Sequence, residues 1–164
     1  MWTAASTGPD LRRRRHAGAT WAGIVVLATA AAGCGDPGAD EPTPAEYAEE
    51  MTAICVDTAA TLDALPAPPE EISFVDFATE AAVALENEAE LARVVDPPDD
   101  LADDHRAFVA NTDEQADAWR SLAATAPDDT DGLNALSERI AALTLGRDDL
   151  SVEMGLDGCR RADV

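Results

Sequence analysis

Residues 101–127 read LADDHRAFVANTDEQADAWRSLAATAP, and this stretch decides the fold class. Every third or fourth residue belongs to one stripe: Leu101, His105, Phe108, Thr112, Gln115, Trp119, Leu122 and Ala126. That spacing places the side chains on one face of an α-helix, because a helix turns once in about 3.6 residues. Asp99 or Asp100 is expected to cap its start, and Pro127 to end it. The stretch therefore predicts one long amphipathic helix.

The preceding residues predict two more helices of the same kind. Thr43-Pro44-Ala45-Glu46 combines a capping box with a proline at the first helical position, and Pro66 ends the helix that follows. Its stripe is Tyr47, Met51, Ile54, Thr58, Leu62 and Leu65. Ser73 opens the next helix, and Pro97 stops it. The stripe of that helix, interrupted at Glu88, is Phe74, Phe77, Ala81, Leu85, Ala92 and Val95.

A fourth helix is predicted to start between Asp129 and Asp131. Its stripe is Leu133, Leu136, Ile140, Leu143, Arg147, Leu150 and Met154. Gly146 leaves open whether the helix continues or breaks, and Gly155 is a plausible left-handed residue just past its end. Four segments of about 20 residues with short proline-rich loops predict an all-α protein, an up-down-up-down four-helix bundle. Aromatic residues make up only 4% of the chain, which also argues against an all-β domain.

The N-terminal residues have the layout of an export signal. Four arginines, 12–15, precede the uncharged run 17–33. That run is at the short limit for a membrane span of about 20 residues, and it is diluted by Ala and Gly. It ends in three small residues, Ala31, Ala32 and Gly33, followed by Cys34. An ordinary secretory signal and an uncut signal anchor are alternatives to a lipoprotein signal.

Residues 12–34 resemble a bacterial lipoprotein signal with its lipobox. The resemblance implies that the chain is cut after Gly33 and that Cys34 carries the lipid, including acyl groups such as palmitate. It places Ala31 where the family most often has Leu. Two or more acyl chains give stable membrane anchoring, whereas one does not. The expected localisation is therefore the extracytoplasmic face of the cell membrane.

This layout divides the chain into a signal peptide at 1–33, a lipidated cysteine with an acidic tether at 34–43, and a helical domain at 44–159. The chain has 11 basic residues, all of them Arg, against 33 acidic residues, and a net charge of −22. Removing residues 1–33 takes away four arginines and one acid, so the net charge becomes −25. Such a chain cannot neutralise a phosphate backbone, which disfavours nucleic-acid partners.

Two cysteines remain in the domain once Cys34 is lipidated. Cys55 lies in the first predicted helix, and Cys159 lies just past the last one. Exported proteins fold in an oxidising setting, so the simplest interpretation is one disulfide that closes nearly the whole domain. A redox or metal role is the alternative, but the chain has no Cys-x-x-Cys motif.

His105 is the one histidine after residue 33, and it is the candidate ligand-binding residue. It could be an axial haem ligand or an acid–base group, or its ring could simply pack at the edge of the core. Any Ser-His-Asp or Cys-His enzyme would need this residue, and no nucleophile motif accompanies it. We therefore expect no catalytic residues, no metal and no cofactor.

Other polar residues allow two interpretations each. The acidic groups 46–50, 86–90 and 103–104 are expected to form solvated faces that attract cationic partners. Thr112, Gln115 and Arg147 interrupt apolar stripes, so they are either exposed or buried together in a polar pocket with Arg147 paired to an acid. The loop from Asp129 to Glu138 partly matches an EF-hand, but Pro127 stands where the first ligand should be.

The whole layout resembles small, Ala-rich lipoproteins of high-GC Gram-positive bacteria, including the ending Gly155-Leu156-Asp157-Gly158-Cys159. Many of these have no assigned activity. A looser similarity is to small helical haemophores, with Tyr47, Met51 and His105 as the available iron ligands. We expect a non-enzymatic interaction module that binds envelope proteins or cationic partners. The competing hypothesis is a carrier of haem, lipid or a cation in the bundle interior.

Overall fold

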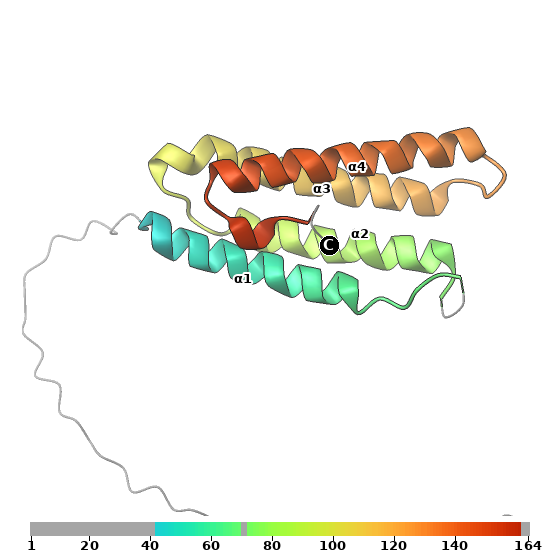
Figure 1. Cartoon of the computed structure of the whole chain (residues 1–164), viewed down its shortest axis with the longest axis horizontal. Coiled ribbons are helices and arrows are strands. Elements are labelled where there is room, and N and C mark those ends of the chain that lie inside the picture. The colour runs from blue at the N-terminus through green and yellow to red at the C-terminus, as the bar shows by residue number, and fades with distance from the viewer. Residues whose placement is uncertain (1–41, 70–71, 162–164) are drawn as a thin grey trace, which may run out of the picture. The chain divides into compact units, whose positions relative to one another are not determined.

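The computed structural model describes residues 42–69 and 72–161, and these residues form helices and no strands. The helices are α1 Pro44–Asp63, α2 Phe74–Arg93, α3 Ala102–Ala124 and α4 Thr130–Glu153, with the short 3₁₀ helices η1 Asp99–Leu101 and η2 Asp157–Cys159. Figure 1 shows the four long helices side by side in one bundle. The predicted signal peptide, Cys34 and most of the predicted tether lie outside the described residues. The all-α prediction is confirmed.

Three of the four predicted helix starts are confirmed. Thr43 and Glu46 form the full capping box of α1, and Ser73 accepts the main-chain N–H of Asp76 at the start of α2. Asp129 caps α4 by accepting the N–H of Gly132. These contacts satisfy N–H groups that have no partner within the helix.

The third helix begins differently from the prediction. Leu101 is the N-cap of α3 and makes no side-chain cap, because η1 supplies the first turn from Asp99. In that turn the N–H of Leu101 donates to the carbonyl of Pro98 at 2.9 Å. Neither Asp99 nor Asp100 therefore caps α3.

The end of α4 makes a tight reversal. The helix runs unbroken through Gly146, and Gly155 has a φ of +70°. The N–H of Leu156 donates to the carbonyl of Ser151 at 2.7 Å, and the N–H of Gly155 donates to Val152 at 3.1 Å. This is the Schellman pattern, in which a left-handed glycine turns the chain away from the helix. Leu156 is thereby carried into the core, where it is fully buried.

The tail after α4 lies between α1 and α4. Helix α2 packs on α1 and α3, and α3 packs on α4, but no Cα atom of α1 comes within 8 Å of α4. Instead, η2 contacts both of these helices (Figure 1). The buried cluster at this place combines α1, the ends of α2 and α4, the first half of α3 and the tail: Tyr47, Met51, Cys55, Ala92, Val95, Phe108, Val109, Met154, Leu156 and Cys159.

A disulfide joins the tail to α1. Cys55 and Cys159 are bonded at a sequence separation of 104, and both are buried. The predicted pairing is confirmed. In the chain-entropy model, a cross-link that closes a loop of about 100 residues stabilises the fold by up to about 4.7 kcal/mol.

The first half of α4 departs from the expected packing. Its predicted stripe, Leu133, Leu136, Ile140 and Leu143, is only half-buried. The buried residues of α4 are Arg147, Asp148 and Ser151. The main chains of α1 and α4 stay more than 8 Å apart, although the side chains of Cys55 and Arg147 meet at 3.5 Å, and this part of the core stays open.

Candidate binding groove and buried polar centre

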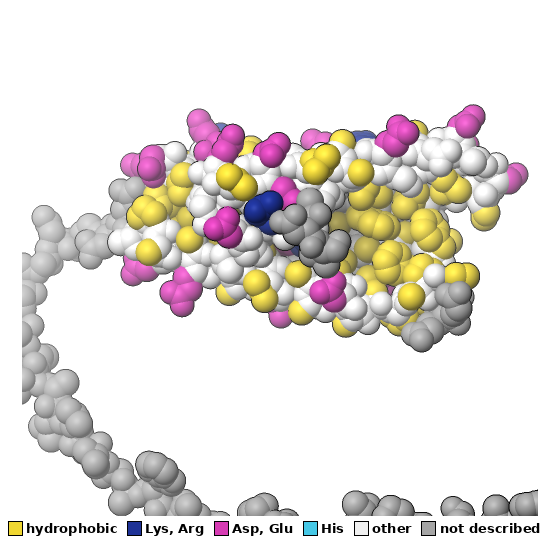
Figure 2. Space-filling model, in the orientation of Figure 1, with side chains coloured by type: hydrophobic (Ala, Val, Ile, Leu, Met, Phe, Trp, Pro, Cys, Tyr) yellow, Lys and Arg dark blue, Asp and Glu magenta, His cyan; other side chains and the backbone are white. Residues whose placement is uncertain are grey.

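An apolar groove of about 210 Å³ lies in this open part of the bundle. Its lining comes from all four long helices and the tail: Leu62, Phe77, Ala81, Leu85, Gln115, Trp119, Ile140, Thr144 and Arg161. Figure 2 shows apolar side chains gathered between α1 and α4, beyond the C-terminal tail. The groove is therefore unfilled core that faces solvent.

Two aromatic side chains form one wall of the groove. Phe77 and Trp119 meet edge to face, with ring centroids 5.9 Å apart and an angle of 69° between planes. Both are half-buried. Edge-to-face pairs are favourable because the positive ring edge meets the negative ring face. The contact holds both rings at the surface of the groove without filling it.

Arg161 forms the charged part of the lining. Its guanidinium pairs with Glu88 through Nη2, and its main-chain N–H donates to Asp148 at 2.8 Å. Its Nε is buried and has no hydrogen-bond partner. The same side chain also lines an adjacent hollow of about 160 Å³ beside Leu62 and Asp63. The Arg161 side chain, paired with Glu88, thus stands where the two hollows meet.

Glu88 links this arginine to a second one inside the bundle. Glu88 and Arg147 are both fully buried, and the Arg147 Nη2 donates to the Glu88 carboxylate. The Arg147 guanidinium also lies 4.9 Å above the centre of the Phe108 ring. Burial lowers the pKa of Arg147 to about 10, although Glu88 opposes that shift. The arginine remains a cation at neutral pH.

This centre corrects one expectation and supports another. Glu88 belongs to an acidic group that we expected to be solvated, yet it is a buried ion-pair partner. Arg147 is buried and paired to an acid, as one of its two interpretations required. The Nε and Nη1 of Arg147 have no partner among the described residues.

His105 lies in a different part of the molecule, near the connection between α2 and α3. Its Nδ1 is 2.9 Å from the Tyr47 hydroxyl, and its ring donates a hydrogen bond to the main chain of Ala92. The Tyr47 hydroxyl also lies 3.5 Å from the sulfur of Met154. His105 is therefore hydrogen-bonded at the edge of the core, but with other partners than Asp104 or Gln115.

Burial shapes the acid–base properties of both rings. Desolvation lowers the pKa of His105 below its ordinary value of 6.5. Desolvation, followed by the nearby charge of Asp104, raises the pKa of Tyr47 to about 12. At neutral pH the two rings are therefore uncharged and share a hydrogen bond.

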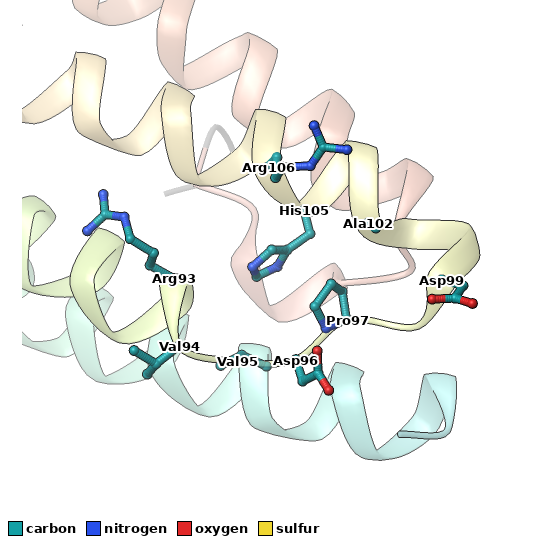
Figure 3. A pocket seen from close by; sticks show the side chains of 9 residues that line it. All are labelled: Arg93, Val94, Val95, Asp96, Pro97, Asp99, Ala102, His105 and Arg106. Carbon is teal, nitrogen blue, oxygen red and sulfur yellow. The ribbon is translucent and has the colours of Figure 1, made fainter. Parts of the chain in front are cut away.

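A wide surface depression of about 520 Å³ lies beside His105. Figure 3 shows His105 pointing from α3 toward the α2–α3 connection, while Arg93 and Arg106 point away from its ring. Arg93 pairs with Asp113 at 2.7 Å, and Arg106 pairs with Asp103. These cations already have acidic partners, so the depression has no convergent set of groups around the imidazole.

The sequence-predicted polar residues are not brought together in one cavity. Gln115 lines the apolar groove, whereas His105 lines the separate depression. Thr112 is buried, and its hydroxyl donates to the carbonyl of Phe108 at 3.0 Å. Of the three suggested iron ligands, His105 and Tyr47 hydrogen-bond to each other, and Met51 is core. The residues that the structure describes hold no group of three or more His, Cys, Asp or Glu that could bind a metal ion.

Sequence reasoning missed the role of Arg161 and the partner of Arg147. A signal was present for the pair: Glu88 and Arg147 both interrupt apolar stripes of predicted helices. Two opposite charges on buried stripes suggest an ion pair across the core. No such signal marks Arg161, which follows the last helix.

Within the described ranges, no helix is long and apolar enough to cross a membrane. Comparisons with protein-family models, curated proteins and solved structures found no match.

Proposed function

We propose that this chain is a membrane-anchored extracytoplasmic lipoprotein with a binding role and no enzymatic activity. The anchor rests on the N-terminal layout, with Cys34 as the lipidated residue. The binding role rests on one observation, the apolar groove between α1 and α4. A hollow lined by aliphatic and aromatic side chains with a few polar groups is the usual form of a ligand site.

The groove supports small-ligand carriage better than partner docking. A docking module needs a filled core and an exposed apolar patch, whereas here one part of the core is left open as a groove. The expected up-down-up-down topology suits this role, because short loops hold the four lining helices side by side. The acidic surface remains a second feature, suited to cationic partners in the envelope.

The anchor is tested by metabolic labelling with palmitate in the bacterial host. The wild-type chain should be labelled and should sediment with membranes. The Cys34→Ala variant should be unlabelled and released. Label that persists in the variant would show that Cys34 is not the lipidated residue.

Carriage is tested by native mass spectrometry of residues 35–164, exported to an oxidising compartment and purified gently. We expect an adduct of small mass on the disulfide-closed chain. A bare chain under these conditions would argue for the docking module instead. A retained haem would point to the His105 region rather than to the groove.

A further inference from the structure

The tail of the chain explains why the groove exists. The disulfide holds η2 against α1, and η2 also contacts α4, so that the main chains of the two helices stay apart. The described tail ends at Arg161, which itself lines the groove. Protein interiors are normally filled to the density of organic crystals. The space beyond Arg161 is filled by no described residue, and Leu62, Ile140 and Trp119 border it.

The lining has two chemical parts. Most of it is aliphatic or aromatic, which favours an alkyl chain because burial of apolar surface is favourable. At the tail side stands Arg161, with Nη2 on Glu88 and with a buried Nε that has no partner among the described residues. A guanidinium binds carboxylates well because its planar N–H groups match the two oxygens. Gln115 adds an amide to the same lining.

We propose that the groove binds a single-chain amphiphile with a carboxylate head, a molecule of the fatty-acid class. The alkyl chain lies against Phe77, Trp119 and Ile140, and the carboxylate lies at Arg161. This inference rests on the proposed carrier function and names its ligand. The volume of about 210 Å³ is below the roughly 300–1,000 Å³ of sites for drug-sized molecules, so one short chain is favoured over a diacyl lipid.

The negative net charge of the chain disfavours an anionic ligand, so a preference for such a ligand would be informative. Residues 34–164 carry a net charge of −25, so long-range forces favour cationic amphiphiles. Exposed charges are largely screened beyond about 8 Å at physiological ionic strength. Only a contact as short as that with Arg161 can reverse the preference. If an anionic amphiphile binds more tightly than a cationic one of equal chain length, the result therefore indicates binding at Arg161 in the groove and not on the acidic surface.

Trp119 allows binding to be measured without a label. Trp2 and Trp21 precede residue 34, so Trp119 is the one tryptophan of residues 35–164, and it lines the groove. We would titrate that chain, at physiological salt and below micelle formation, with decanoate, decanol and decyltrimethylammonium. Decanoate should shift the Trp119 emission saturably and bind at least tenfold more tightly than the cation. Octanoate should bind roughly tenfold more weakly than decanoate, because it buries two fewer methylene groups.

Matched variants of α4 test the location. Ile140→Glu places a charge in the half-buried lining and should weaken decanoate binding more than tenfold. Leu145→Glu makes the same change on the same helix at a side chain that is 59% exposed, and it should leave binding unchanged. Arg161→Gln should remove the preference for decanoate over decanol. Thermal unfolding by circular dichroism checks that each variant is folded. If Arg161→Gln does not fold, the comparison of decanoate, decanol and decyltrimethylammonium on the wild type tests the head group.

Each contrary result overturns a stated part of the inference. Equal or tighter binding of decyltrimethylammonium would show that surface charge governs the interaction. Equal losses in Ile140→Glu and Leu145→Glu would place binding outside the groove. Tighter binding of decanol than of decanoate would show that the carboxylate head is not recognised. An adduct retained in the native mass spectrum would still support the carrier function. Failure of all three amphiphiles, with a different adduct retained in the mass spectrum, would overturn the ligand class but not the carrier function.

Discussion

Glu88 is the residue on which two arginines converge, the buried Arg147 and the half-buried Arg161. Its two carboxylate oxygens face Arg147 and Arg161. Removing any of these three charged side chains from water would cost much more free energy without the other two. Removing one partner from a buried ion pair leaves a charge that is neither solvated nor compensated. The energetic role of Glu88 is therefore to compensate the charges of the buried Arg147 and the half-buried Arg161.

The Glu88→Gln variant should lose about 3 kcal/mol of unfolding free energy, because it leaves both guanidiniums without the shared carboxylate. Urea denaturation at neutral pH measures the loss. Glu90→Gln is the matched control on the same helix, at an exposed position, and it should change stability by less than about 0.5 kcal/mol. Equal effects of the two substitutions would contradict a specific buried role for Glu88.

His105 should make stability depend on pH. Its pKa is lowered by burial in the folded state, so the unfolded chain binds the proton more readily. The stabilising effect of the neutral ring is complete above the ordinary pKa of 6.5, and it is lost as pH falls from there toward the lower folded pKa. The stability difference between wild type and His105→Gln should therefore shrink as pH falls from 7 to 5.

Guanidinium denaturation at several pH values checks this prediction. His105 is the one histidine after residue 33, so the carboxylates that titrate at lower pH are common to both chains. Their effect cancels in the difference. A difference that stays constant or grows on acidification would mean that the ring is not held neutral by burial.

At the scale of the element, a glycine in the middle of α4 and a glycine just past its end have opposite roles. Gly155 has a positive φ, which an L-residue adopts only at a cost of about 1–2 kcal/mol. Gly146 is in the helix interior, and a Cβ there would meet only the Asn111 side chain, at 3.4 Å. One glycine is required by the turn, and the other only weakens the helix.

Gly155→Ala should therefore destabilise the fold by about 1 kcal/mol or more, because alanine is strained at this φ. Gly146→Ala should stabilise it by about 0.5–1 kcal/mol, since alanine loses less conformational freedom in a helix. Thermal unfolding of the two variants in parallel gives the signs. The same sign for both would be inconsistent with the described end of α4.

At the scale of the whole molecule, the disulfide determines where the bundle closes and where it stays open. Cys159 ties the tail to α1, which places Leu156 in the core and Arg161 beside Glu88. The tail thus completes one part of the core and separates α1 from α4. The groove follows from that separation.

The double variant Cys55→Ala, Cys159→Ala should lower the unfolding free energy by about 3–5 kcal/mol, because the unfolded chain regains the freedom that the cross-link removes. Guanidinium denaturation measures the change. Adding a reductant to the wild type should reproduce most of it and should leave the double variant unchanged. A wild type insensitive to reductant would show that the bond contributes little.

Local features determined what the sequence predicted correctly. The caps at Thr43 and Ser73 and the period of each stripe define where helices form, and these depend on residues within a few positions of one another. The disulfide was predictable because the domain holds two cysteines. Within the candidate site, Gln115 and Arg147 stood out as polar residues on apolar stripes.

The tertiary structure alone decided which stripes are covered. Ile140 and Leu62 have the same apolar pattern as residues of the closed core, yet they line a groove where the main chains of α1 and α4 stay apart. The burial of Glu88 and the position of Arg161 likewise depend on how distant segments meet. Sequence periodicity predicts which face of a helix is apolar. The way in which the helices and the tail pack determines whether that face is buried.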